Sequence, residues 1–541
     1  MALALACPLA ADARVGAVAA EHRFAAEAGA ETLRLGGSAV DAAVAAAAAG
    51  CVVHASSCGI GGGGFALGRL AGGGSFALDF RERAPAGATQ DRYLDNGVPH
   101  PERLQHGGLA IAAPGEVAGW EALHARYGRL PLPKVLAPAI KLARDGFALD
   151  DAPHLREQIE HSHALLEADP GLRAVFLQPD GQVPGPGFRV VQADLARTLE
   201  AIAAHGAGAF YAGPVAAAIV AAVQARGGVL TAHDLTDYRV RWRKPLVGSY
   251  RGRSLITFPP PGSGGIVLEA LGLLAHDDPA ALNTDPPTWL RLLAGVMAQA
   301  FADRAHWYGD PEFTPVPVAS LLAPARLARL RAEMNAHPCP APETALARDA
   351  GTANVSVVDG DGNAVALTTT INTSFGAGVM AAGTGIVLNN EMDDFAVAPG
   401  VANVYGLVGT NANAIAPGKR PQSSMSPTIV LDGARPELVA GGSGGPFIIS
   451  GVLQVVLGVV AFRRDLEAAV TAPRIHDQGT PAALLVEPTL PAPTREALAS
   501  FCHPIKVFPG IGAVSAAGLA AGGTPKAAGD PRKDGGAVVV R

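Results

Sequence analysis

The sequence contains few cysteines, few charged residues for its length and no cluster of basic ones. Its five cysteines, Cys7, Cys51, Cys58, Cys339 and Cys502, are scattered and form no CxxC pair. We therefore expect buried, small apolar side chains rather than a disulfide or zinc framework. The chain carries 42 basic and 48 acidic residues without any basic block, which argues against nucleic acid as a partner.

Long apolar runs are also missing. No segment reaches the roughly 18 consecutive apolar residues of a transmembrane helix, and the richest run, residues 42–53, is bounded by Asp41 and His54. We expect no membrane span. Residues 1–13 are apolar and end like a signal peptide, but they lack a positively charged start and are short for one. The chain as written is therefore expected to be cytoplasmic, or periplasmic or secreted if its true start lies further upstream.

Apolar residues nevertheless make up 49% of the 541 residues, which is enough for a large core and excludes a disordered chain. At roughly 150 residues per domain, this length corresponds to three or four domains or to one composite unit. Apolar residues at helical spacing mark much of the first part of the chain, at residues 15–53, 133–144, 195–204, 214–225 and 289–307. Strand patterns interrupt it at residues 65–70 and 76–80.

The pattern changes near residue 336. Residues 336–351 contain three prolines and no periodicity, which indicates an exposed connection. Strand patterns follow at residues 353–358 and 364–370, on either side of a hairpin turn at 359–363, and again at 428–431 and 437–440 before an apolar helix at 447–462. Strands without regular βα alternation predict an α+β fold in which two sheets pack face to face inside outer helices.

Three cofactor or metal patterns fail on their context. Residues 59–64 satisfy GxGxxG, but a strand rather than a helix follows them, so we expect a structural loop and not a dinucleotide site. The acidic turn at 359–363 lacks the glycine and glutamate that a calcium loop needs next. His161 and His163 are two residues apart on a helix and point to different sides. We expect no metal and no organic cofactor.

The run Gly-Gly-Ser-Gly-Gly at 441–445 lies between a strand and a helix, which is the context of a nucleophile elbow. Ser443 could then act with Asp477 or Glu487 and with His503, although no alternating βα units precede it. The same turn could instead offer the free backbone N–H groups of a helix start to an oxyanion. Both interpretations remain open at this point.

Thr352 opens a strand directly after the exposed connection and follows Gly351. A threonine hydroxyl needs a neighbouring base, and a cut before Thr352 would supply one in its own α-amine, whose pKa is near 8. Hydroxyl-rich residues 368–374, the acidic cluster at 389–394 and the segment 419–427 are, together with Arg81, suited to bind a free amino acid end. An ordinary strand with polar loops is the alternative.

Several long motifs, which follow one another in a fixed order, give the sequence a resemblance to a known protein family. They lie at residues 36–43, 57–65, 80–85, 356–376, 388–395, 403–406 and 419–427. From about residue 14 to its C-terminus the sequence resembles the γ-glutamyltranspeptidases, also called γ-glutamyltransferases or glutathione hydrolases, which are N-terminal nucleophile hydrolases. The resemblance implies a four-layer αββα sandwich built from a precursor that cuts itself between Gly351 and Thr352. The large piece, 14–351, and the small piece, 352–541, would remain together as a heterodimer.

The resemblance also assigns roles. It implies that Thr352 is the nucleophile, that Thr370 activates it, and that Gly444 and Gly445 form the oxyanion hole. The residues expected to bind a γ-glutamyl substrate are Arg81, Ser423 and Ser424 at its α-carboxylate, Asn372, Glu391 and Asp394 at its α-amino group, and Tyr405 above the pocket. Glutathione or another γ-glutamyl compound would be the donor, and water or an amino acid or peptide amine the acceptor.

Two positions depart from the family pattern. Ala353 replaces a second threonine after the nucleophile, and Pro446-Phe447 follow the two glycines where the family usually shows Ser-Arg, so a basic side chain near the acceptor is missing. A same-fold acylase, of the cephalosporin or glutaryl acylase type, remains the nearest alternative, because it would use the same nucleophile on a different acyl group.

Overall fold

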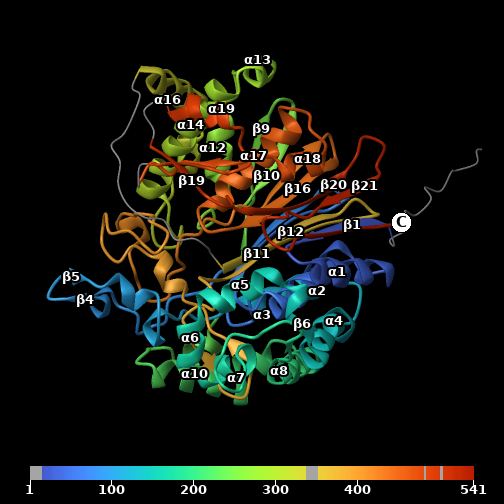
Figure 1. The fold of residues 1–541 in the computed structure, drawn as a ribbon, viewed down its shortest axis with the longest axis vertical. Helices are drawn as coiled ribbons and strands as arrows, with labels where there is room; N and C mark the ends of the chain where they lie inside the picture. Colours follow the sequence, from blue (N-terminus) through green and yellow to red (C-terminus); the bar gives the residue numbers. More distant parts are fainter. Residues whose placement is uncertain (1–14, 337–350, 481–482, 500–503) are drawn as a thin grey trace, which may run out of the picture.

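The protein consists of two β-sheets that face each other, with helices covering both outer faces (Figure 1). The computed structural model describes residues 15–336, 351–480, 483–499 and 504–541. The predicted N-terminal tail, most of the predicted connection and His503 lie outside these residues. The four layers confirm the predicted αββα architecture.

The first sheet has seven antiparallel strands in the order β22-β1-β11-β12-β2-β3-β8. Their bounds are β1 Gly16–Ala20, β2 Gly63–Arg69, β3 Ser75–Phe80, β8 Arg241–Arg243, β11 Gly351–Asp359, β12 Ala364–Asn372 and β22 Gly536–Val540. Strand β11 pairs with β1 on one side and β12 on the other. Segments from before and after residue 351 therefore alternate within one sheet.

The second sheet has six strands in the order β21-β20-β16-β15-β10-β9. They are β9 Leu246–Tyr250, β10 Arg253–Thr257, β15 Thr428–Asp432, β16 Arg435–Ser443, β20 Ala513–Leu519 and β21 Pro525–Ala528. A polar contact joins the two sheets, since Ser356 Oγ on β11 donates to the Ser515 carbonyl on β20 at 2.8 Å. The smaller pieces of sheet are β4 Leu94–Asp95 with β5 Val98–Pro99, β6 Phe147–Ala148 with β7 Arg189–Val190, β13 Met380–Ala381 with β14 Ile386–Val387, and β17 Ile475–His476 with β18 Leu484–Val486 and β19 Ile505–Val507.

The outer helices form two groups, one on each sheet (Figure 1). The first sheet is covered by α1 Arg23–Arg34, α2 Ala39–Val53, α3 Glu116–Tyr127, α4 Leu132–Asp145, α5 Pro153–His161, α6 His163–Ala168, α7 Pro170–Phe176, α8 Ala193–His205, α9 Gly208–Tyr211, α10 Gly213–Ala225 and α11 Ala232–Thr236. The second is covered by α12 Gly264–Leu273, α13 Pro279–Thr284, α14 Pro286–Trp307, α15 Val318–Leu321, α16 Pro324–Ala336, α17 Phe447–Val460, α18 Leu466–Thr471 and α19 Ala492–Ala499. Within the described part of the chain, none of these helices combines the length and apolar character that spanning a bilayer requires.

Most of the predicted elements are present, and one was wrong. Ser38 caps α2 through a reciprocal pair of hydrogen bonds with Asp41, and the hairpin turn is confirmed because Asp359 accepts hydrogen bonds from the N–H groups of Asp361 and Asn363. Residues Gly16–Ala20, however, were expected to be helical and form strand β1. This short run of small apolar residues has no period that separates strand from helix, and pairing on both edges decides its conformation.

Candidate active site

Thr352 lies at the start of β11, opposite Thr370 on the neighbouring strand β12. The pairing register shifts between Gly351 and Thr352, so the strand bulges at the predicted cleavage site. Thr352 Oγ1 is 3.1 Å from Thr370 Oγ1, and both side chains are almost fully buried. The peptide bond that the sequence analysis singled out is thus next to two hydroxyl groups.

Thr370 makes three hydrogen bonds through its hydroxyl group. It donates to the carbonyl oxygen of Gly351 at 2.5 Å, and it accepts from the backbone N–H of Asn372 at 2.9 Å. Since its single proton is used for Gly351, the contact with Thr352 must be donated by the Thr352 hydroxyl. A chain of two hydroxyl protons therefore runs from Thr352 through Thr370 to the Gly351 carbonyl.

The glycine run begins as a loop, as predicted, but Gly63 and Gly64 already belong to strand β2 and pair with Thr370 and Thr369. A Cβ on Gly62 would lie 1.9 Å from the carbonyl oxygen of Thr370, so only glycine fits there. The close approach of this loop helps hold Thr370 in place.

A small pocket opens at Thr352. Its lining combines nearly all the residues predicted from the sequence with two apolar side chains: Arg81, Thr352, Thr370, Asn372, Glu391, Asp394, Tyr405, Ser423, Ser424, Met425, Gly445 and Ile448. These residues come from β3's C-terminal side, from β11 and β12, and from four separate loops or helix starts. Among the predicted residues, Gly351 and Gly444 adjoin the lining without belonging to it.

Arg81 is the centre of the charged side of the pocket. Its guanidinium forms ion pairs with Glu391 and Asp394, and it is 3.5 Å from Glu82. Burial opposes the charge of Arg81, but Glu391, Asp394 and Glu82 outweigh this effect and raise its pKa. Burial also raises the pKa of Glu82 to about 7 and that of Glu391 well above its usual range, although Arg81 partly offsets both.

The acidic wall beside Arg81 is held by the segment that carries Tyr405. The Tyr405 hydroxyl donates to the carbonyl oxygen of Asn372 at 2.9 Å, and Asn403 Nδ2 donates to Asp394 Oδ1 at 3.3 Å. Asn372 has φ of 76°, a left-handed conformation that asparagine tolerates better than most residues. Tyr405 is buried and therefore closes one side of the pocket in this structure.

Ser423 and Ser424 form the hydroxyl side of the pocket. Ser423 Oγ accepts the backbone N–H of Met425 at 3.2 Å, and Ser424 Oγ accepts a hydrogen bond from Arg304 Nη2 at 3.1 Å. Each serine oxygen thus accepts a hydrogen bond from the protein. The proton of each serine hydroxyl therefore remains available for an acceptor in the pocket. Arg304 was not singled out by the sequence, because it is one residue inside a long helix, α14.

Gly444 and Gly445 connect β16 to α17 with φ of 114° and 56°. Neither N–H donates to another residue among those the structure describes, so both remain available at the start of the helix. Ser443 beside them is buried. Glu487, one of the acids of the serine-triad alternative, is paired with Arg532 at 2.5 Å. The structure gives Ser443 no triad among the described residues.

Two groups behind Thr352 were not predicted from the sequence. Lys533 Nζ donates to the carbonyl oxygen of Thr352 at 2.6 Å and lies 3.2 Å from Glu21. Glu21 Oε1 in turn accepts the N–H of Asn354 at 3.0 Å, and burial raises the pKa of Glu21 to about 7 although Lys533 lowers it in part. No local pattern links these residues, which lie at opposite ends of the chain.

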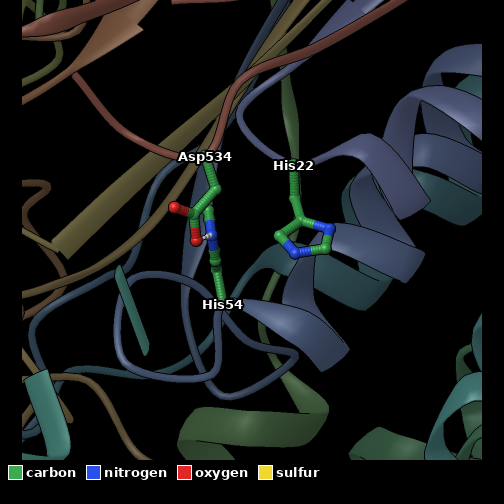
Figure 2. A group of neighbouring side chains, drawn as sticks. All are labelled: His22, His54 and Asp534. Atoms are coloured by element: carbon green, nitrogen blue, oxygen red, sulfur yellow. Dashed lines mark hydrogen bonds and ion pairs between the residues drawn. The ribbon is translucent and has the colours of Figure 1, made fainter. Parts of the chain in front are cut away.

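His22, His54 and Asp534 form a second cluster (Figure 2). His22 directly follows Glu21 in the sequence, and Asp534 directly follows Lys533. Figure 2 shows the Asp534 carboxylate facing His54, at 3.4 Å from its Nε2. His22 Nδ1 accepts the N–H of Phe24, so its Nε2 carries the proton and donates to the Asp151 carbonyl. Both His22 nitrogens are occupied, and no lone pair is left for a metal ion. The cluster instead anchors the segment that presents Lys533 to Thr352.

The sequence model of the gamma-glutamyltranspeptidase family matches residues 25–540. The chain belongs to this family. The glutathione hydrolase proenzyme of Escherichia coli (strain K12) is 39% identical to this γ-glutamyltranspeptidase-family protein over 529 residues. The alignment covers 96% of this chain and 91% of the Escherichia coli protein. Membership makes the protein an enzyme of the N-terminal nucleophile hydrolase class, and it favours the threonine site over the serine triad.

Acylases are also among its relatives. The acylase ACY 1 proenzyme of Pseudomonas sp. (strain V22) is 37% identical, with 97% of this chain and 93% of that protein covered. The crystal structure of a cephalosporin acylase from Bacillus halodurans superposes with a TM-score of 0.86 at 28% identity, over 99% of this chain and 98% of that one. The γ-glutamyltranspeptidase fold is therefore shared with acylases, and the lining of the pocket must distinguish the two activities.

Proposed function

We propose that this protein is a self-cleaving γ-glutamyltransferase and glutathione hydrolase whose nucleophile is Thr352. The main support is the arrangement at one pocket, where the Thr352–Thr370 hydroxyl pair lies next to an arginine, three acidic or amide groups and two serines. Those groups match the ammonium and carboxylate of an amino acid end. No metal or organic cofactor is required by this chemistry.

The first reaction is the cut between Gly351 and Thr352. The Thr352 oxygen attacks the Gly351 carbonyl carbon, its proton moves to Thr370, and the Thr370 proton moves to the Gly351 oxygen along the observed hydrogen bonds. As this intermediate collapses, the proton on the Gly351 oxygen passes to the Thr352 nitrogen, the carbonyl re-forms and the C–N bond breaks. Gly351 is left as an ester on Thr352, which now has a free α-amine. Water then hydrolyses the ester and releases the Gly351 carboxylate.

The second reaction uses the new N-terminus. The Thr352 α-amine takes the hydroxyl proton while the oxygen attacks the γ-amide carbonyl of the donor. The N–H groups of Gly444 and Gly445 receive the negative charge that develops on the carbonyl oxygen. The Thr352 ammonium group then gives its proton to the donor's nitrogen, the C–N bond breaks and the amine leaves, so that a γ-glutamyl ester remains on Thr352. Water converts this ester to glutamate, or an amino acid or peptide amine converts it to a new γ-glutamyl amide.

Substrate binding follows from the two sides of the pocket. Arg81, Ser423 and Ser424 would hold the α-carboxylate, because hydroxyl protons and a guanidinium are its natural partners. Asn372, Glu391 and Asp394 would hold the α-ammonium group. Tyr405 would close over the bound glutamyl group.

The two pieces would remain together after the cut. Strands β1, β2, β3 and β8 of the large piece share a sheet with β11, β12 and β22 of the small piece, and β11 is hydrogen-bonded between β1 and β12. Among the described strands, separation would break the four backbone ladders that join the pieces, β1–β11, β1–β22, β2–β12 and β10–β15. It would also expose the core, so we expect a stable heterodimer.

An acylase acting on a different acyl group is the second candidate, since acylases are close in sequence and fold. The pocket favours the γ-glutamyl donor because the single charge of Arg81 offsets only part of the negative charge of its acidic partners, Glu391, Asp394 and Glu82. An acyl group without an ammonium group would leave the rest of that charge unmatched.

The decisive experiment is the intact mass of the purified protein beside its Thr352→Ala variant. We expect two fragments from the wild type, the smaller beginning Thr-Ala-Asn-Val, and one uncut chain from the variant. Turnover of a γ-glutamyl anilide by the wild type alone would complete the assignment. Fragments from both proteins, or an active wild type that is a single chain, would refute it.

A further inference from the structure

Arg304 is a buried cation whose charge is not matched by an acid. Its side chain is 3% exposed, and it extends from α14 toward the wall of the pocket formed by Ser423 and Ser424. Among the residues that the structure describes, none places a carboxylate within ion-pair distance of its guanidinium. Its two partners are hydroxyls: Nε donates to Ser263 Oγ at 3.2 Å, and Nη2 donates to Ser424 Oγ at 3.1 Å.

Arg81 and Arg304 differ in their charged neighbours. Arg81 is surrounded by Glu391, Asp394 and Glu82, so its charge is compensated before any substrate arrives. Burial lowers the pKa of Arg304 to about 10, with Asp394 acting in the opposite direction, which leaves it protonated at neutral pH. A buried positive charge without a counter-ion is costly unless an anion joins it.

Arg304 is also connected to both pocket serines. It bonds Ser424 directly, and it bonds Ser263, whose hydroxyl donates to the carbonyl oxygen of Ser423 at 2.5 Å. Because Arg304 occupies a lone pair of Ser424 Oγ, the Ser424 proton is directed away from the guanidinium. A hydroxyl polarised by a cation in this way is a stronger donor to a carboxylate.

We propose that Arg304 is a positioning residue that orients the Ser424 and Ser423 side of the pocket and supplies the positive charge that selects an α-carboxylate. This inference rests on the proposed γ-glutamyl specificity and extends it. The α-carboxylate would lie between two arginines. Arg81 is already paired with acidic residues, and Arg304 would act on the carboxylate through the Ser424 hydroxyl. Substrates whose α-carboxylate is amidated would lose the benefit of Arg304.

The test compares two competitive inhibitors of γ-glutamyl anilide turnover, L-glutamate and its α-amide, isoglutamine. In the wild type we expect glutamate to bind roughly 100-fold more tightly. In Arg304→Met the ratio should fall about 10- to 30-fold, mainly because glutamate binds more weakly, while kcat changes less than about 3-fold. Arg304→Lys, which keeps the charge, should restore part of the ratio.

Three controls separate this role from a structural one. Arg329→Met removes an exposed arginine of α16 that pairs with Glu333, and we expect no change in either inhibition constant. Ser263→Ala removes only the link to Ser423 and should lower the ratio about 3-fold, which keeps the test available if Arg304→Met does not mature. Combining Arg304→Met with Ser424→Ala should add little to the larger single effect.

Equal weakening of both inhibitors in Arg304→Met, or no weakening of either, would overturn the proposal. Failure of the proposed function would be seen differently, since the wild type itself would then neither turn over the γ-glutamyl anilide nor bind glutamate.

Discussion

Replacing Thr370 with valine tests the hydroxyl relay most directly. Valine keeps the β-branched shape of threonine in the centre of a sheet but removes the group that donates to the Gly351 carbonyl at 2.5 Å and contacts Thr352 Oγ1 at 3.1 Å. The Gly351 oxygen would lose its donor from Thr370 at the moment when negative charge develops on it. The Thr352 proton would lose its nearest acceptor.

The size of the effect follows from these contacts. Removing one donor to an oxyanion raises a barrier by about 3–4 kcal/mol, which is roughly 100- to 1000-fold in rate. We expect self-cleavage of Thr370→Val to slow by at least this factor. The variant also leaves the N–H of Asn372 without its 2.9 Å acceptor, and an unpaired buried amide costs about 1–3 kcal/mol of stability.

The assay is the time course of the two fragments on a denaturing gel, with intact mass to fix the cut. Thr370→Ser keeps the hydroxyl and should mature close to the wild-type rate. Thr368→Val is the matched control, because Thr368 lies on the same strand and donates to Asn354 Oδ1 at 2.9 Å instead. If Thr370→Val matured as fast as Thr368→Val, the relay through Thr370 would be wrong.

Two further predictions concern charge. Asp394→Asn keeps the shape of the ammonium side but removes a charge paired with Arg81, so kcat/KM for a γ-glutamyl anilide should fall roughly 30- to 150-fold, the equivalent of about 2–3 kcal/mol; unchanged kinetics would exclude Asp394 from substrate binding. Burial, aided by His54, lowers the pKa of His22 from 6.5 to about 4. The stability that neutral, buried His22 allows the folded protein is therefore fully present above pH 6.5 and is lost as the pH falls toward 4. In an uncut Thr352→Ala background, His22→Gln should remove about 2 kcal/mol of this acid sensitivity between about pH 7 and about pH 4.5, as measured by urea titrations. Equal sensitivity with and without His22 would contradict it.

The hairpin of β11 and β12, which carries Thr352 and Thr370, was predictable because its signals are local. The turn at 359–363 fixes the pairing of Val358 with Ala364, and an antiparallel ladder then brings Thr352 opposite Thr370. The turn at Gly444 and Gly445, for which we propose the oxyanion role, was predictable for the same reason, as a glycine pair between a strand and a helix. Strand β1 was missed because its small apolar residues fit helix and strand equally well.

The remaining groups could not be predicted from local pattern. Arg304, Lys533 and Glu21 reach the site from a helix, a late loop and the end of the first strand, each far in sequence from the residue it contacts. Their position depends on how the two sheets and their outer helices pack, and a single sequence carries no direct signal of such long-range contacts.

On the proposed mechanism, one hydrogen-bond arrangement serves two reactions in succession. Before the cut, the Thr370 proton is committed to the Gly351 carbonyl, so Thr370 can assist attack on the chain's own backbone. The cut removes that acceptor, frees the Thr370 hydroxyl for Thr352 and creates the α-amine at the same place. Lys533, which holds the Thr352 carbonyl, does not depend on the Gly351 bond. The nucleophile can therefore keep its position while its base appears, and this explains why processing and catalysis can share one pocket without a large rearrangement.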